Sequence, residues 1–158
     1  DFDSMKTYLS DDYTMRFFDH GPMGDEAIID FMSKPVYLIV KRDTHEVIGH
    51  FIYHPWFMID TYEIGWVLNK EYHNQGIITA LAKAVLKYAF EEDKAHRVVA
   101  TCQPENIASK RVCEKSGMRL EGLFKKCIYV ERLDQWWDEL FYAMLEEEYE
   151  SLKQSLNI

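Results

Sequence analysis

Residues 72–79 have the composition of an anion-binding turn. The turn is polar and contains Gly76. It follows residues 63–68, which are typical of a buried strand, and precedes residues 80–92, where apolar side chains recur at helical spacing. The first N–H groups of a helix have no partner within the helix, so they can bind phosphate without a charged side chain. The sequence therefore predicts a site for a phosphorylated ligand at the start of this helix.

Length and charge limit the class of protein. A chain of 158 residues is long enough for one domain with its own hydrophobic core. The net charge of -9 is unfavourable for binding nucleic acid, and it suits a basic or amine-bearing substrate as well as simple solubility. No apolar run reaches the ~18 residues that a membrane-spanning helix needs. We therefore expect a cytoplasmic protein that binds neither nucleic acid nor membrane.

The cysteines and histidines do not form a metal-binding pattern. Cys102, Cys113 and Cys127 are odd in number and lack ligand spacing, which favours free thiols in a reducing compartment. His50 and His54 lie four residues apart on one face of an expected strand, but the sequence offers them no third ligand nearby. We expect no metal, and we interpret the two histidines as packed or surface side chains.

The order of the predicted elements is that of an α+β domain. Helices are expected within residues 2–20, 25–32, 80–92 and 107–116, and strands at 35–42, 47–54, 61–68, 95–102, 119–130 and 138–145. The strand–helix–strand succession in the middle implies a parallel pair joined by a right-handed crossover. Gly117 fits the left-handed position that ends the last helix. Residues 146–158 are charged and are expected to form a frayed tail.

A second segment carries a resemblance to a known family. Residues 106–109 read NIAS, and the helix that they open ends in Gly117-Met118. With the Gln75-Gly76 turn, the EIG strand at residues 63–65 and the closing WD pattern at 137–138, this segment resembles the GNAT superfamily of acetyl-CoA-dependent N-acetyltransferases. Within that superfamily it looks like the RimJ/RimL branch of protein N-terminal acetyltransferases. The resemblance runs from about residue 5 to residue 149.

The resemblance implies a single GNAT-like domain over residues 1–150 and a C-terminal tail at 151–158. Its sheet is expected to be mixed and mostly antiparallel, with the central crossover and with helices on both faces. Family members normally have a strand before the first helix, and the sequence shows none here. We expect either that residues preceding Asp1 supply this strand or that an exposed sheet edge is left to pair with another chain. The protein is accordingly expected to be a monomer or a homodimer.

The resemblance also implies which residues bind the cofactor, acetyl-CoA. Its diphosphate is expected on the N–H groups of residues 74–79, aided by the Thr79 hydroxyl and the helix dipole. Asn106 is expected to hold the pantetheine chain. The expected cofactor-binding residues are Trp66, Val67, Leu68, His73, Asn74, Gln75, Gly76, Ile77, Ile78, Thr79, Asn106 and Ser109.

Acetyl transfer to a primary amine requires a base, an oxyanion donor and an acid. A carboxylate or an ordered water must remove a proton from the amine, and Glu63 is the candidate base. A backbone N–H within residues 66–68 can stabilise the tetrahedral oxyanion. The leaving thiolate needs a proton donor. Many GNAT members use a Tyr at the position of Cys113, whereas the RimJ/RimL-like pattern implies Ser109.

The phosphate-binding turn departs from the family pattern. His73 stands where Gln or Arg is preferred, and Asn74 replaces a usual Gly. Ile78 replaces a final Gly or Ala, so its bulk bears on how closely the backbone can approach a diphosphate. Met118 replaces a Phe. The order of elements and the N-x-x-S helix are the more specific part of the match.

Several alternatives stay open at the level of sequence. The acceptor implied by the branch is a protein N-terminal α-amine, but a small polyamine or an aminoglycoside would also suit an acidic protein. A CoA-binding module without catalysis is a third reading. Glu63 could be a solvent-facing strand residue, and Ser109 could be a polar residue of a first helical turn.

Overall fold

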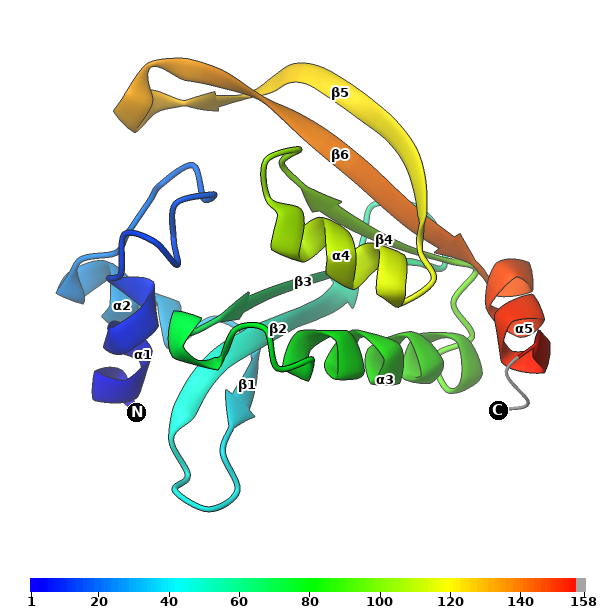
Figure 1. Cartoon of the computed structure of the whole chain (residues 1–158), viewed down its shortest axis with the longest axis horizontal. Helices are drawn as coiled ribbons and strands as arrows, with labels where there is room; N and C mark the ends of the chain where they lie inside the picture. Colours follow the sequence, from blue (N-terminus) through cyan, green and yellow to red (C-terminus); the bar gives the residue numbers. More distant parts are fainter. Residues whose placement is uncertain (156–158) are drawn as a thin grey trace.

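The computed structural model describes residues 1–155 as one α+β domain (Figure 1). Its helices and strands, in chain order, are α1 (Phe2–Leu9), α2 (Asp25–Phe31), β1 (Tyr37–Val40), β2 (Val47–Pro55), β3 (Thr61–Leu68), η1 (Lys70–Tyr72), α3 (Ile77–Glu91), β4 (Arg97–Cys102), α4 (Ile107–Lys115), β5 (Arg119–Val130), η2 (Glu131–Leu133), β6 (Gln135–Leu145) and α5 (Glu146–Ser155). Among these, no helix combines the length and the apolar character that crossing a membrane requires.

The strands form one mixed sheet, and this confirms the predicted fold class. Their order in the sheet is β1-β2-β3-β4-β6-β5. Only β3 and β4 run parallel, joined by the crossover through α3, and the other neighbours are antiparallel. The long hairpin of β5 and β6 arches above α4 in Figure 1.

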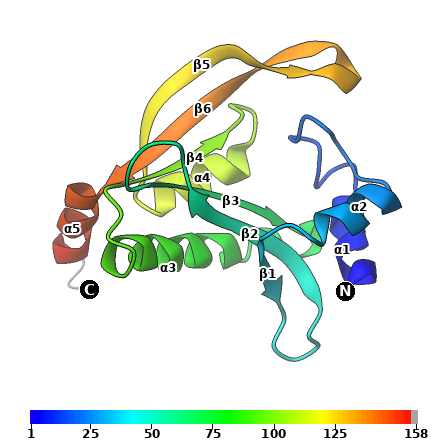
Figure 2. The ribbon, with the colours of Figure 1, turned by 180° about the vertical axis from the view of Figure 1, so that it is seen from behind.

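Helices cover both faces of the sheet. Strand residues point alternately to the two faces, so neighbours on β3 belong to different cores. Ile64 packs in the core beneath α3 and α4, together with Leu86 and Tyr142. Val67 packs on the other face, against α1 and α2. Figures 1 and 2 both show α3 and α4 side by side, with α1 and α2 grouped at the far end of the sheet.

The N-terminal segment is less helical than its spacing predicted. Helix α1 ends at Leu9, and Tyr13, which extends the apolar spacing, is exposed. The cause is local: the carboxylate of Asp11 accepts hydrogen bonds from the backbone N–H and the hydroxyl of Thr14, both at 2.8 Å. Such a side-chain turn competes with helix continuation. Residues 10–24 therefore form a folded loop.

Arg132, at the tip of the β5–β6 hairpin, clamps this loop. Its guanidinium donates to the backbone carbonyls of Arg16, Phe18 and Asp19 at 3.1 to 3.2 Å. These partners lie more than 110 residues away in sequence, so no local pattern could have predicted the contact.

The C-terminal prediction was wrong over residues 146–155. The charged run forms helix α5, and the expected division at residue 150 falls inside it. Tyr149 is buried and stacks on Phe90, with ring centroids 5.0 Å apart, and Leu152 packs against the same core. The three glutamates of the first turn favour the helix N-terminus electrostatically. The rest of the expected tail, residues 156–158, lies outside the described residues.

His50 is a buried polar residue between the sheet and the N-terminal helices. The side chain is 3% exposed, its Nδ1 lies 3.0 Å from the hydroxyl of Tyr8, and its ring packs against Phe31. Burial lowers the pKa of His50 from 6.5 to about 4. The folded protein therefore holds this imidazole neutral.

We predict that His50 makes the protein less stable in mild acid. Below pH 6.5 the imidazole of His50 binds a proton in the unfolded chain, whereas in the folded protein it binds one only below about pH 4. The free energy of unfolding therefore falls as the pH is lowered from 6.5 to 4. Between pH 7 and 4.5 the loss is about 2 kcal/mol. Urea unfolding of the wild type and of His50→Gln across this range measures it. Equal pH slopes for the two proteins would contradict the prediction.

Candidate active site

The parallel strands β3 and β4 pair over a short stretch and then separate. Their register joins Thr61, Tyr62 and Glu63 to residues 97–99, and no further pair follows within the sheet. Beyond Glu63, β3 stays paired with β2, while β4 stays paired with β6. The two strands thus form a fork that opens toward their carboxyl ends, and both views show them diverging (Figures 1 and 2).

A cavity of about 870 Å³ occupies this fork. Parallel strands have their carboxyl ends at the same edge of a sheet, so the start of α3 and the start of α4 both lie at its mouth. Every residue that the sequence assigned to the site borders the cavity: Glu63, Trp66, Val67, Leu68, the turn His73, Asn74, Gln75, Gly76, Ile77, Ile78 and Thr79, and Asn106 and Ser109. The structure therefore brings together segments that are 40 residues apart in sequence.

The turn before α3 leaves its backbone N–H groups unused. Gly76 is the N-cap, with φ of +74°, and it supplies no side chain to cap the helix. The first bonded helical N–H is that of Ala80, which donates to the carbonyl of Gly76 at 3.0 Å. The N–H groups of residues 77–79 therefore remain free at the positive end of a 15-residue helix. This geometry suits a phosphate group.

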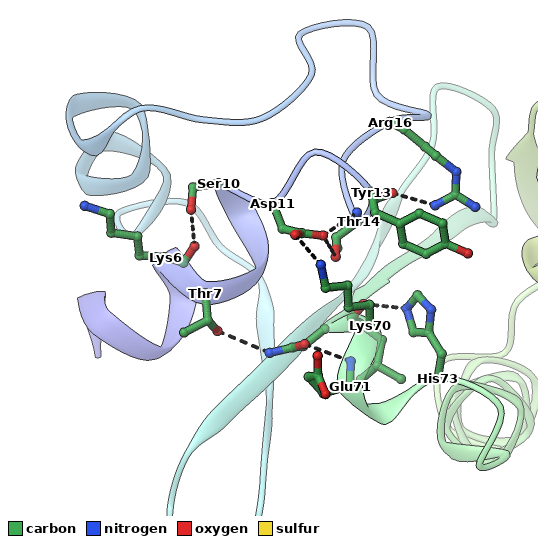
Figure 3. A network of polar contacts seen from close by, with 12 residues as sticks. Lys6, Thr7, Ser10, Asp11, Tyr13, Thr14, Arg16, Lys70, Glu71 and His73 are labelled. Carbon is green, nitrogen blue, oxygen red and sulfur yellow. Dashed lines mark hydrogen bonds and ion pairs between the residues drawn. The ribbon is translucent and has the colours of Figure 1, made fainter.

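Side chains from two segments hold this turn in place (Figure 3). His73 Nε2 donates to the carbonyl of Leu68 at 2.7 Å and so ties the turn to the end of β3. Asn69 donates to the hydroxyl of Thr7 at 3.2 Å. Lys70 pairs with Asp11 at 2.7 Å, and this hydrogen bond lowers the pKa of Asp11. The turn is therefore fixed before any ligand binds.

The departures from the family pattern have structural explanations. Asn74 has φ of +60°, a conformation that glycine adopts without cost and that asparagine tolerates better than most residues. Ile78 is 8% exposed and packs against Ile48 and Leu68, so its bulk points into the core and away from the turn. Neither residue obstructs the approach of a ligand to the backbone.

Helix α4 faces the cavity with two polar side chains. Asn106 is the N-cap, and its Oδ1 accepts from the N–H of Ser109 at 3.2 Å, which leaves the amide nitrogen of Asn106 available to a ligand. The hydroxyl of Ser109 accepts from the indole N–H of Trp66 at 3.2 Å. That bond links the two arms of the fork and leaves the hydroxyl proton of Ser109 free to donate.

Glu63 sits at the root of the fork. It is the last β3 residue paired with β4, and 30% of its side chain is exposed. Its Oε1 lies 3.1 Å from Nε2 of His54, its cross-strand partner on β2. Its neighbour Ile64 points to the α3 face, so Glu63 enters the cavity from the opposite side of the sheet.

Comparison with known proteins identifies the family. Residues 1–119 match the acetyltransferase (GNAT) domain. The chain belongs to the GNAT acetyltransferase family. The uncharacterized N-acetyltransferase YnaD of Bacillus subtilis (strain 168) is 43% identical over 155 residues, which cover 94% of this chain and 90% of YnaD. A GNAT-family acetyltransferase from Bacillus anthracis, known from a crystal structure, is also 43% identical, with a TM-score of 0.86 and coverage of 93% and 90%.

A more distant relative carries a substrate in its name. The ribosomal-protein-serine acetyltransferase of Escherichia coli (strain K12) is 29% identical over 85 residues, covering 54% of this chain and 46% of that protein. GNAT acetyltransferases act on amines and generally use acetyl-CoA, so this chain is an N-acetyltransferase.

The acetyltransferase cavity is also bordered by residues that the sequence did not predict, and two of these borders carry polar groups. One is the loop of residues 13–19, which is clamped by Arg132. The other is Glu139 on β6. Burial raises the pKa of Glu139, and the negative charge of Glu63 raises it further. Glu139 directly follows the WD pattern at residues 137–138, and this pattern was the one sequence feature that pointed to the segment.

Cys113, His50 and His54, which the sequence also singled out, do not border the acetyltransferase cavity. Cys113 is 1% exposed in the core beneath α3 and α4, and burial raises the pKa of its thiol. His50 and His54 do not share a ligand: the first binds Tyr8 and the second contacts Glu63. Within residues 1–155, groups of three or more side chains that could hold a metal ion do not occur.

We predict that the backbone of Gly76, rather than the space around it, limits substitution of this turn. A Cβ at Gly76 would meet nothing within 4 Å, but its φ of +74° costs an L residue about 1–2 kcal/mol. Gly24 is a matched control, because it is also an uncapped helix N-cap in open space, with φ of -79°. Urea unfolding should show Gly76→Ala to be clearly destabilised and Gly24→Ala to change little. Equal losses would count against the prediction.

Proposed function

We propose that this acetyltransferase moves the acetyl group of acetyl-CoA directly to a protein N-terminal α-amine, as a member of the RimJ/RimL-like branch. One observation carries the proposal: a single cavity at the fork is bordered both by the uncapped start of α3 and by Glu63, whose neighbour Ile64 points to the α3 face. A cofactor and an amine can therefore approach one point from two sides.

The residues at the mouth fit acetyl-CoA. The free N–H groups of residues 77–79 suit its diphosphate, with the Thr79 hydroxyl beside them. The amide nitrogen of Asn106 suits a carbonyl of the pantetheine chain. Backbone groups of residues 66–68 that point toward β4 have no strand partner there, so they are available to the same chain. When bound, the cofactor supplies an activated acetyl thioester.

The side chains at the fork divide the proton chemistry. Glu63 accepts a proton from the amine, which must be neutral to attack the thioester carbonyl. A backbone N–H within residues 66–68 stabilises the oxyanion. Ser109 donates its hydroxyl proton toward the departing sulfur, and the indole of Trp66 fixes the orientation of that hydroxyl. Cys113 is too deeply buried to serve as this donor.

Two considerations favour an N-terminal α-amine as acceptor. An α-amine has a pKa near 7.7–8.0 and loses its proton more easily than a lysine at about 10.4, so a single carboxylate suffices as its base. The Escherichia coli relative is named as a ribosomal-protein-serine acetyltransferase.

A small polyamine is the second candidate, and the carboxylates of the cavity favour it. Glu63 and Glu139 both border the cavity, and the chain carries a net charge of -9. Two acidic groups on one side of a cleft suit an acceptor with more than one ammonium group.

An acceptor panel tests the proposed function. The purified protein is given acetyl-CoA with a peptide bearing a free serine or alanine N-terminus, the same peptide with a blocked N-terminus and an internal lysine, spermidine, and an aminoglycoside. We expect thiol release, and a mass gain of one acetyl group, with the free N-terminus only. Acetylation of spermidine but not of the peptide would replace this acceptor with the polyamine. Thiol release with none of the amines would contradict the proposal.

We predict that Glu63→Gln slows transfer without weakening cofactor binding. The amide cannot accept the amine proton, and general base catalysis is commonly worth about 10²–10⁴-fold in rate. Acetyl-CoA should still bind with nearly wild-type affinity, because the turn before α3 is unaffected. Initial rates with the acceptor amine that the panel identifies measure the first effect. Calorimetric titration of acetyl-CoA measures the second. A variant with the wild-type rate at every pH would remove Glu63 from the base role.

A further inference from the structure

His54 contacts Glu63 from outside the cavity. The two residues are cross-strand partners on β2 and β3, and Nε2 of His54 lies 3.1 Å from Oε1 of Glu63. Glu63 borders the cavity, whereas His54 does not, and 47% of the histidine side chain is exposed. The pair therefore connects the interior of the active site with the solvent.

The hydrogen bonds of His54 determine where its protons are. Nδ1 lies 2.9 Å from the carbonyl oxygen of Pro55, and a carbonyl oxygen can only accept, so Nδ1 carries a proton. In a neutral imidazole Nε2 would then be an acceptor facing a carboxylate oxygen, which is also an acceptor. The contact between Nε2 and Glu63 is therefore a hydrogen bond whenever one of the two side chains carries a proton there. Because only one side of Glu63 is used, its other oxygen stays free.

The reaction needs such a proton path. In acetyl transfer a C–N bond forms as the C–S bond breaks, and an ammonium group loses two protons. One proton ends on the thiol sulfur and the other must leave the site. A carboxylate that keeps its proton cannot act in the next turnover, so Glu63 needs an outlet.

We propose that His54 is a positioning residue that holds Glu63 at the root of the fork and passes the proton of the acceptor amine from Glu63 to the solvent. The inference rests on the proposed base role of Glu63. A proton that Glu63 takes from the amine passes across the Oε1···Nε2 contact to His54, and the exposed imidazolium releases one proton to water, so Glu63 is again a carboxylate. The histidine returns to its starting state, and no further reactant is consumed.

One other titratable group affects this pair. Glu139 on β6 borders the same cavity, and its pKa is sensitive to the charge of Glu63. Any ionisation seen in a rate profile could therefore belong to His54, to Glu63 or to Glu139. A Glu139→Gln variant, measured in parallel, separates the last contribution from the first two.

The test compares His54→Ala and His54→Gln with the wild type, using the amine that the panel identifies. The glutamine keeps a donor for Glu63 but cannot titrate, whereas the alanine removes both functions. His96, an exposed histidine that does not border the cavity, gives the control His96→Ala. We expect His54→Ala to lower kcat roughly tenfold with an unchanged KM for acetyl-CoA. Imidazole added to the buffer should restore part of the rate, because the vacated site opens to solvent.

The pH profile of kcat/KM gives the second readout. The wild type and His96→Ala should share one ionisation that is missing from His54→Gln. An unchanged profile in His54→Gln, together with no response of His54→Ala to imidazole, would overturn the proposal. Thermal unfolding midpoints close to that of the wild type exclude misfolding. If Glu63→Gln is slow while the His54 variants are normal, only the role of His54 fails. If Glu63→Gln is as fast as the wild type, the base assignment fails first.

Discussion

The separation of β3 from β4 after three residue pairs is the feature on which the rest of the site depends. A parallel pair that continued to both strand ends would close the sheet, and the two helix starts would lie over a covered surface. Here β3 stays paired with β2 and β4 stays paired with β6, so each strand loses backbone hydrogen bonds only on the side that faces the fork. The free strand edges inside it are polar backbone, which must be satisfied by a ligand, a side chain or water.

The fork explains why residues on opposite faces of one sheet can act together. Ile64 and Trp66 point toward α3 and α4, while Glu63 points to the other side. In a continuous sheet these side chains would be separated by the backbone layer. At the fork they border one cavity, and the bond from Trp66 to Ser109 spans the opening. The Arg132 clamp then fixes one border of the cavity, because it holds the loop of residues 13–19 against the hairpin tip.

Local sequence patterns predicted most of the fold and selected residues that border one cavity. The helix after residue 106 has boundaries set by nearby residues, because Asn106 caps its start and Gly117 has the left-handed conformation after its end. The errors came from tertiary contacts. The helix of residues 146–155 depends on the stacking of Tyr149 on Phe90, and Glu139 enters the cavity only because β6 pairs with β4. Phe90 and β4 are both distant in sequence from the segments that they contact. Composition alone therefore suggested a solvated tail for residues 146–155 and an ordinary strand position for Glu139.

The turn before α3 shows why a motif can vary in side chains and still keep its geometry. What an anion requires here is a set of free N–H groups, and two left-handed residues, Asn74 and Gly76, produce it. The residue type matters only where the backbone conformation excludes alternatives, as at Gly76. Ile78 is tolerated because its side chain belongs to the core. His73 serves by donating to the carbonyl of Leu68, a task that any long donor side chain at this position could perform.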